Sequence, residues 1–314
     1  MAETAQTRPT GAPGRLGGRP VNRVGYGAMQ LENTERERAV GLLRRAVELG
    51  VDHIDTAQFY GHANEMIRAA LHPYPDHLVV VSKVGAVHDD GGTYGLAPAQ
   101  RPRDLRASVE ANLRSLGAER LDVVNLRRLD GPGAGIRASG DQIVDLQDQL
   151  DELVALRREG KIGDIGLSNV TADQLRRAMP AGIACVQNSY NLLDRSSAAV
   201  LDACREHDIA WVPFFPLGSA LPGMTKVAEH PAVVAAAESA GRTPAQVGLA
   251  WLLGHDPRVL LIPGTTDPTH LEQNLAVADF ALDAETTAAL DALADDASPG
   301  TERGRETFPA RGRT

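Results

Sequence analysis

The chain has 314 residues, of which 43% are hydrophobic and 23% charged, and its formal net charge is −9. An acidic chain argues against nucleic acid and anionic membranes as partners, because both attract clusters of lysine and arginine. The sequence shows no apolar run near the roughly 20 residues that cross a bilayer and no apolar signal core, and it has only two cysteines, Cys185 and Cys204. We therefore expect a cytoplasmic protein without disulfides.

Residues 1–14 open the chain with a stretch rich in threonine, proline and glycine that has no periodicity, and they predict a flexible tail. From residue 15 to residue 297, helix-like and strand-like segments follow one another without a long linker. This continuity predicts a single domain. Residues 298–314 resemble the first segment in composition and predict a second flexible tail.

The predicted helices are marked by apolar residues at helical spacing and by capping residues at their ends. Asn33 and Thr34 offer an N-cap to the first helix, Thr243 caps a later one, and Gly50 and Gly117 suit C-terminal positions. In chain order the predicted helices are Glu35–Leu49, Asn64–Leu71, Arg103–Leu116, Ile143–Glu159, Thr171–Met179, Ser196–Glu206, Pro231–Ala240, Pro244–Leu253, Pro268–Ala276 and Asp283–Leu293.

Short β-branched and apolar runs lie between these helices and predict buried strands. In chain order they are His53–Asp55, His77–Lys83, Leu121–Leu126, Ile162–Leu167, Ile183–Gln187, Ile209–Phe215 and Val259–Pro263. Regular alternation predicts a parallel sheet, because a parallel crossover needs the length that a helix supplies. About eight such units favour an α/β fold of the closed (β/α)8 TIM-barrel type. A Rossmann domain is disfavoured, since no G-x-G-x-x-G stands between a strand and a helix.

Polar side chains recur where the predicted strands end, and in a barrel that edge carries the chemistry. Each has a structural alternative. Asp55 could cap the next helix, Lys83 could be a solvated strand end, and Tyr60 could be a packed aromatic at a turn. Ser168 and Asn169 could cap the helix that follows them. The full set is Asp55, Tyr60, Lys83, Asn125, Arg127, Ser168, Asn169, Gln187 and Asn188.

The histidines give little support to a metal site. His53 and Asp55 form an H-x-D pattern, but no second histidine cluster completes a tetrahedral site, and H-x-x-x-H spacing is absent. We interpret His53 as structural. A metal-dependent hydrolase on the same barrel is the weakest of the functional alternatives, and bound zinc in the purified protein would be needed to support it.

Taken together, these segments resemble the aldo-keto reductase superfamily from about Leu16 to Leu293. VGYGAMQL is similar to the family's opening glycine-rich stretch, and VDHIDTAQFYGHANEMIRAAL carries its Asp-Thr-Ala, Tyr-Gly and Asn-Glu signature. GKIGDIGLSNV resembles the Gly-x-Ser-Asn motif and VQNSYNLLDR the Gln-x-x-Tyr-Asn segment. VPFFPLGSA resembles the Tyr-Ser-Pro-Leu-Gly strand, and LIPGTTDPTHLEQNLA the cofactor phosphate loop. Each motif is weak alone, but the ordered set is specific.

The resemblance implies reduction of an aldehyde or ketone by hydride transfer from NADPH. A carbonyl that accepts hydride develops negative charge on oxygen, where a proton must be delivered. Tyr60 matches the proton donor. Lys83 matches the lysine whose charge eases that transfer, and Asp55 matches the residue that holds the lysine charged and oriented.

The resemblance also assigns the cofactor residues. Ser168, Asn169 and Gln187 match positions that hold the carboxamide, Phe214 matches the aromatic that stacks on the nicotinamide, and Asp55 belongs to the same site. The remaining matches are Gly27, Ala28 and Met29 in the opening loop, Phe215, Pro216, Leu217, Gly218 and Ser219 over the pyrophosphate, and Gly264, Thr265, Thr266, His270, Gln273 and Asn274 at the adenosine end.

Two positions depart from the family pattern. The family usually has a histidine where LDVVNLRR places Arg127, and strand alternation points Arg127 into the barrel. Arginine cannot shuttle a proton, but it can donate two parallel hydrogen bonds to an oxyanion or a carboxylate. Its structural alternative is an ion pair with Asp55 or a loop acid. At the adenosine end, Thr265, Thr266 and His270 stand where family members that prefer NADP usually carry lysine or arginine. The resemblance to the family implies NADP, and NAD remains possible.

The missing histidine leaves a second function open. A barrel of this kind could bind the cofactor as a redox-sensing or regulatory protein and turn over little. The identity of the carbonyl substrate depends on loops, which we place at residues 86–101, 130–141 and 220–230, together with the C-terminal tail.

Overall fold

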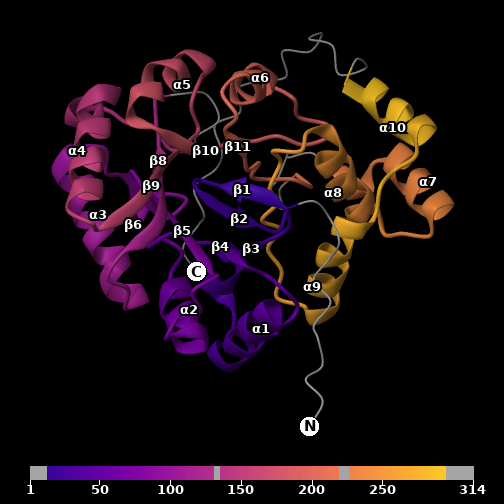
Figure 1. Ribbon diagram of the computed structural model, residues 1–314, viewed down its shortest axis with the longest axis horizontal. Helices are drawn as coiled ribbons and strands as arrows, with labels where there is room; N and C mark the ends of the chain where they lie inside the picture. The colour runs from indigo at the N-terminus through magenta and orange to yellow at the C-terminus, as the bar shows by residue number, and fades with distance from the viewer. Residues whose placement is uncertain (1–12, 131–134, 219–225, 295–314) are drawn as a thin grey trace.

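The computed structural model describes residues 13–130, 135–218 and 226–294 (Figure 1). Ser219 and nearly all of both predicted tails lie outside these ranges. The first described strand, β1, begins at Gly14. Both cysteines are buried and free, as the sequence predicts.

The centre of the fold is a curled parallel sheet in the order β11-β10-β9-β8-β5-β4-β3. Each strand is short and largely buried, as the apolar runs of the sequence predict. All strand pairings within this sheet are parallel. The strands are β3 (Tyr26–Gly27), β4 (His53–Asp55), β5 (Val79–Val84), β8 (Leu121–Arg127), β9 (Ile162–Ser168), β10 (Ile183–Gln187) and β11 (Ala210–Trp211).

Residues 259–261 close this sheet into a ring. Val259 forms a parallel bridge with Trp211 on one side, and Leu261 forms one with Val24 on the other. The N–H of Leu260 donates to the carbonyl of Trp211, and that of Leu261 to the carbonyl of Arg23, both at 2.8 Å. These bonds join the two edges of the sheet, so the predicted (β/α)8 barrel is confirmed.

A hairpin of β1 (Gly14–Leu16) and β2 (Arg19–Val21) lies across one end of the barrel (Figure 1). Leu16 and Val21 are each 2% exposed and pack against Val79 and Val123 from inside the barrel. Burial of this apolar layer excludes water from that end. The strands' carboxyl ends, where chemistry is expected, are at the other end.

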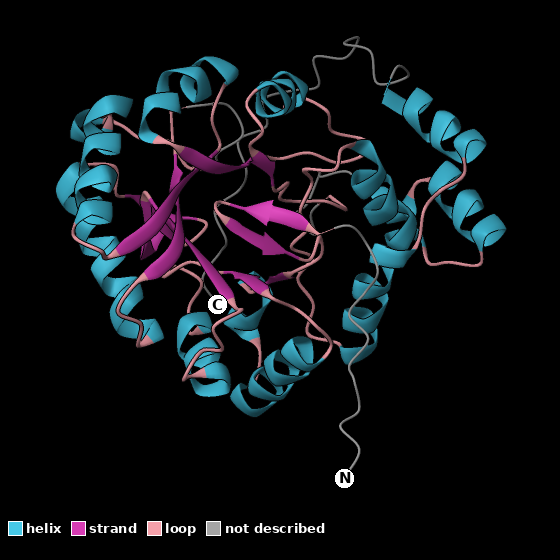
Figure 2. Cartoon of the chain, in the orientation of Figure 1, coloured by secondary structure: helices cyan, strands magenta, loops and turns pink. Residues whose placement is uncertain are grey.

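Helices surround the strands (Figure 2). The helices are α1 (Arg36–Glu48), α2 (Ala63–Leu71), α3 (Pro102–Leu116), α4 (Leu146–Arg158), α5 (Ala172–Ala178), α6 (Ala198–Glu206), α7 (Pro231–Ala240), α8 (Pro244–His255), α9 (Pro268–Leu275) and α10 (Ala284–Asp291). Short 3-10 turns are η1 (Met29–Asn33), η2 (Gly140–Gln142), η3 (Met179–Ala181), η4 (Val227–Glu229), η5 (Ala276–Asp279) and η6 (Ala292–Ala294).

Two predicted strands are shorter than the sequence indicates. Of Ile209–Phe215 only Ala210 and Trp211 form a strand, and Val259–Pro263 contributes isolated bridges. Pro213 and Pro263 have no backbone N–H to donate, so they interrupt the ladder. The segments nevertheless occupy the predicted places in the barrel.

The cap of α1 differs from the prediction. Glu35, not Asn33 or Thr34, caps the helix, because its carboxylate accepts from the N–H groups of Glu37 and Arg38, both at 3.0 Å. Thr34 directly follows η1, and its hydroxyl donates to the carbonyl of Gln30 within that turn. The preceding 3-10 turn thus delays the helix start by one residue.

Residues 86–101 form a hairpin in place of much of the predicted loop. β6 (Ala86–Thr93) pairs with β7 (Leu96–Pro98) in antiparallel register. Most of β6 is exposed, so it carries no alternating apolar pattern by which it could have been predicted.

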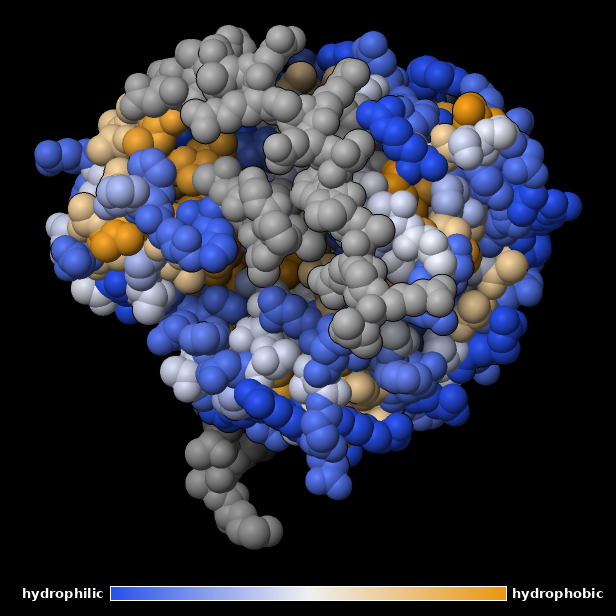
Figure 3. All heavy atoms as spheres, turned by 180° about the vertical axis from the view of Figure 1, so that it is seen from behind, coloured by the Kyte–Doolittle hydropathy of each residue, from blue (hydrophilic) through white to orange (hydrophobic). Residues whose placement is uncertain are grey.

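The space-filling view shows mainly hydrophilic side chains over the described part of the visible face (Figure 3). None of the described helices is long and apolar enough to span a bilayer.

Candidate active site

Three predicted catalytic residues lie together at the carboxyl end of the barrel. Asp55 ends β4 and Lys83 is the penultimate residue of β5, and these strands are hydrogen-bonded neighbours. The Nζ atom of Lys83 donates to Oδ1 of Asp55 and, at 3.2 Å, to the carbonyl of Thr56. Lys83 is 6% exposed and Asp55 3%. The two side chains form a buried ion pair.

Lys83 is a cation held by its neighbours. Burial lowers its pKa, because a charged group loses hydration, but attraction to Asp55 and Tyr60 outweighs burial and raises the pKa above the ordinary value. Its Nζ lies 5.1 Å from the centre of the Tyr60 ring. Lys83 therefore places a fixed positive charge beside the tyrosine.

The turn between β4 and α2 fixes the backbone position of Tyr60. Its N–H donates to the carbonyl of Ala57 at 3.0 Å, and its own carbonyl accepts from the N–H of Ala63 at 2.9 Å. The ring meets the edge of Phe59 at a centroid distance of 5.2 Å. The side chain is half-buried.

The hydrogen bonds argue against simple capping roles for the strand-end residues. Both oxygens of Asp55 accept from other side chains, Lys83 and Gln187, and neither of these donors is a helix N–H. Helix α5 is capped by Thr171, whose hydroxyl accepts from the N–H of Gln174 at 3.2 Å. Ser168 and Asn169 therefore do not cap α5.

Gln187 presents an unused acceptor to this cluster. Its Nε2 donates to Oδ2 of Asp55 at 2.6 Å, whereas its Oε1 accepts no hydrogen bond from the described residues. The side chain is 1% exposed. Because an unpaired buried acceptor is costly, this atom fits a ligand that donates an N–H.

Asn169 is held in an unusual backbone conformation beside Gln187. Its φ is 60°, in the left-handed region that asparagine tolerates better than most residues. Its Nδ2 donates to the carbonyl of Arg128 at 2.9 Å. The amide of Asn188 forms two hydrogen bonds with the backbone of Val170, at 3.0 and 2.7 Å. The strand end that carries Ser168 and Asn169 is therefore rigidly fixed.

Arg127 is the last residue of β8 and is half-buried. Its guanidinium carbon lies 5.9 Å from the centre of the Phe59 ring. Burial lowers the pKa of Arg127, and attraction to Tyr60 raises it in part. An arginine so placed is still a cation at neutral pH. The structure thus places Arg127 beside Phe59 and close enough to Tyr60 for electrostatic attraction.

The predicted opening and phosphate loops meet across the barrel rim. A Cβ added to Gly27 would lie 2.4 Å from the carbonyl oxygen of Ile262, and one added to Gly264 would lie 2.8 Å from that of Gly27. Only glycine allows this close approach. The hydroxyl of Tyr26 donates to the carbonyl of Thr265 at 2.7 Å, and Ala28 donates to that of Asp55. Met29 is 48% exposed beside them.

The segment after β11 carries the residues that the resemblance assigns to the nicotinamide ring and the pyrophosphate. Phe214 and Phe215 pack edge to face at 5.1 Å, and the φ of Phe215 is 54°. Asn191 donates to the carbonyl of Phe215 at 3.0 Å. Pro216, Leu217 and Gly218 follow, all half-buried.

At the predicted adenosine end, α9 carries His270 in its first turn and Gln273 and Asn274 farther along. His270 is exposed, and Asn274 is 9% exposed. The hydroxyl of Thr265 accepts from the N–H of Asp267 at 3.0 Å, which shapes the turn. Asp267 then caps α9 by accepting from the N–H groups of Thr269 and His270.

Arg38 is a cation at this end that the sequence does not reveal. It lies in the first turn of α1, and its Nε donates to the carbonyl of Thr266 at 3.1 Å. A cavity of about 390 Å³ lies between these segments, lined by Gln30, Asn33, Thr34, Glu35, Arg38 and Thr266. The 228 positions that separate Arg38 from Thr266 hide their proximity from a reading of local motifs.

These features fit a nicotinamide dinucleotide. Gln187 offers its acceptor to a carboxamide, the glycines at 27 and 264 leave room for a backbone-close ligand, and Arg38 adds a cation near the phosphate loop. A metal finds no such fit: among the described residues, no group of three or more histidine, cysteine or acidic side chains could hold one.

Known proteins resemble this chain over most of its length. Residues 23–295 match the Aldo/keto reductase family. The chain is 43% identical over 288 residues to pyridoxine 4-dehydrogenase of Escherichia coli (strain K12), and this match covers 88% of this chain and 96% of that protein. It is 33% identical over 290 residues to an uncharacterized oxidoreductase of Schizosaccharomyces pombe, covering 88% of each.

Solved structures are similar over nearly the whole chain. An aldo-keto reductase from Klebsiella pneumoniae in complex with NADPH has a TM-score of 0.75 and 27% identity, covering 96% of this chain and 100% of that one. An aldo/keto reductase from the same organism, in complex with NADP and acetate, has a TM-score of 0.73 and 26% identity, covering 94% and 100%. The chain belongs to the aldo/keto reductase family and is an NAD(P)-dependent oxidoreductase.

Proposed function

We propose that this enzyme reduces a ring aldehyde to the alcohol with NADPH, that Tyr60 is the proton donor, and that pyridoxal is a substrate. The observation that carries the reaction type is the buried Asp55–Lys83 pair beside the Tyr60 ring. The substrate is suggested by the relative that is 43% identical and is a pyridoxine 4-dehydrogenase.

The chain's residues act on the carbonyl oxygen. NADPH supplies the hydride when it is bound. The hydroxyl of Tyr60 donates its proton to the oxygen as negative charge develops there. The ammonium of Lys83 stabilises the tyrosinate that remains, and Asp55 keeps that ammonium in place. Gln187 accepts a hydrogen bond from the carboxamide and thereby orients the ring.

Tyr60 packs against a buried apolar cluster. Ala57, Phe59, Ala86, Leu129 and Ile136 form this cluster. Arg127 adds a cation near the Phe59 ring at the border of this cluster. Pyridoxal combines a flat ring, an aldehyde and an acidic hydroxyl on the neighbouring carbon. Arg127 would bind that oxygen while Tyr60 addresses the aldehyde.

Steady-state oxidation of NADPH by pyridoxal tests this function. We expect many turnovers per enzyme, and formation of pyridoxal from pyridoxine with NADP⁺ in the reverse direction. Tight NADPH binding without turnover of any ring aldehyde would exclude the proposed substrate class. A single burst of oxidation, followed by no turnover, would instead favour the redox-sensing or regulatory alternative.

Cofactor choice gives a separate prediction. We expect NADPH to bind more tightly than NADH, because Arg38 and His270 lie at the adenosine end and can face a 2′-phosphate. Fluorescence titration with both cofactors measures this. Equal affinities, or a preference for NADH, would refute the choice of NADP.

A further inference from the structure

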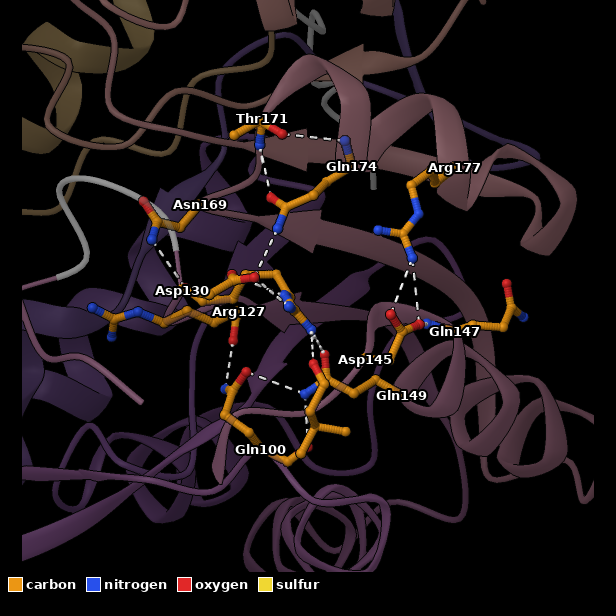
Figure 4. A network of polar contacts seen from close by, with 12 residues as sticks. Gln100, Arg127, Asp130, Asp145, Gln147, Gln149, Asn169, Thr171, Gln174 and Arg177 are labelled. Carbon is orange, nitrogen blue, oxygen red and sulfur yellow. Dashed lines mark hydrogen bonds and ion pairs between the residues drawn. The ribbon is translucent and has the colours of Figure 1, made fainter. Parts of the chain in front are cut away.

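Two consecutive arginines at the end of β8 have different environments. The carbonyl of Arg127 is part of a buried polar network, while its guanidinium extends away from that network (Figure 4). Arg128 is 5% exposed, and its guanidinium turns toward the helices. Its Nε donates to Oδ1 of Asp130 at 3.0 Å, and its Nη1 donates to the carbonyl of Val144 at 3.1 Å and to Oε1 of Gln149.

The network continues from Gln149 to Gln100, both of which are almost wholly buried, at 0% and 2% exposure. The Nε2 of Gln149 donates to the carbonyl of Gln100 at 2.6 Å and to its Oε1 at 3.1 Å. The Nε2 of Gln100 then donates to the carbonyls of Gly85, at 2.6 Å, and Arg127, at 2.9 Å. One amide thus bridges two backbone carbonyls.

The donors and acceptors of this network can run in one direction only. A guanidinium donates and never accepts, so it must face the oxygen of Gln149. The NH₂ of Gln149 then faces Gln100 and meets its oxygen, which turns the NH₂ of Gln100 toward the two carbonyls. The buried cation of Arg128 therefore determines the orientation of both amides.

The two bridged carbonyls belong to the strands that carry the candidate site. Gly85 follows Lys83 by two residues, and the paired ladder of β5 and β8 ends just before it. Gly85 has a φ of 109°, and a Cβ there would lie 2.4 Å from the carbonyl oxygen of Arg127. The amide of Gln100 joins the strand ends where backbone pairing stops.

The same peptide is fixed on its other side. The N–H of Arg128 donates to the carbonyl of Ser168 at 2.9 Å, and its carbonyl accepts from Asn169. Every backbone group between Arg127 and Arg128 is therefore bound. An arginine side chain can act on a substrate only if its backbone origin is fixed to a fraction of an ångström.

We propose that Arg128, Gln149 and Gln100 form a positioning relay that fixes the backbone of Arg127 and sets its place relative to Lys83. The relay touches no reacting atom. It rests on the role of Arg127 given in the proposed function. Its members are positioning residues, and their effect on turnover passes through the Arg127 guanidinium.

Gln149→Glu tests the relay with the smallest change. The carboxylate still accepts from Arg128, but an oxygen replaces the NH₂ and opposes the oxygens of Gln100. We expect kcat with pyridoxal and NADPH to fall about tenfold, as a misplacement of under 1 Å can cause, while the Kd for NADPH changes little. Gln149→Met, which carries no charge, is the second variant should the carboxylate hinder folding. Gln147→Glu is the matched control, because Gln147 lies exposed on the same helix, with Asp151 as its partner.

The decisive measurement combines these changes with Arg127→Ala. If the relay acts through Arg127, Gln149→Glu should have almost no further effect on kcat in the Arg127→Ala background. An equal fold-loss in both backgrounds, or a lower Tm with unchanged kcat, would show that the network is structural only and overturn the relay. Normal turnover of Arg127→Ala alone would contradict the role of Arg127 itself, so the two failures are distinguishable.

Discussion

Tyr60→Phe is expected to lower kcat by roughly a hundred- to ten-thousandfold, the range for loss of a general acid, and to leave the Kd for NADPH unchanged. The substitution removes only the hydroxyl. The ring still packs on Phe59, and the Asp55–Lys83 pair keeps its hydrogen bond. Stopped-flow measurement of hydride transfer, with deuterated NADPH to identify the slow step, determines the loss in the chemical step.

Tyr74→Phe is the matched control, because it removes the same atom elsewhere. The hydroxyl of Tyr74 donates to the carbonyl of Leu116, the last residue of α3, at 2.6 Å. This variant should lose some stability, about 1 kcal/mol for one hydrogen bond, and keep its turnover. A loss of only a few-fold in Tyr60→Phe, with hydride transfer shown to be rate-limiting, would exclude Tyr60 as the proton donor.

The barrel and the polar residues at its strand ends could be predicted from the sequence alone. Asp55 and Lys83 end apolar runs, and the strand-end rule places such residues at one rim whatever their separation in sequence. Their contact in the structure follows from that rule. Tyr60 lies in a turn, which the rule does not cover, and it was found through the Tyr-Gly signature.

Residues outside local motifs were missed for a physical reason. Arg38 reaches Thr266 from a helix at the opposite end of the chain, and Gln100 reaches Arg127 from the start of α3. An exposed arginine and a loop glutamine carry no pattern of their own, so only the three-dimensional structure reveals their partners. The hairpin of β6 and β7 was missed for a similar reason, since its exposed strands have no apolar alternation.

Arg127→Ala is expected to lower turnover of pyridoxal roughly ten- to a hundredfold. A charge-assisted hydrogen bond contributes about 1.5–3 kcal/mol, and each 1.36 kcal/mol is about a factor of ten in rate. Arg127 is a half-buried cation attracted to Tyr60, so its guanidinium can donate to the developing oxyanion or to a neighbouring oxygen of the substrate. Arg127→Lys keeps the charge but loses the planar pair of donors, and should restore turnover only partly.

A pair of substrates separates these two uses of Arg127. 2-Hydroxybenzaldehyde carries an oxygen next to its aldehyde and benzaldehyde does not. If Arg127 binds that oxygen, Arg127→Ala should reduce kcat/KM far more for 2-hydroxybenzaldehyde, because benzaldehyde never made the contact. If it donates to the oxyanion, both substrates should lose the same factor, since both develop that charge. Unchanged turnover of both substrates would assign Arg127 to a structural ion pair. Proton delivery would then depend on Tyr60 and Lys83 alone.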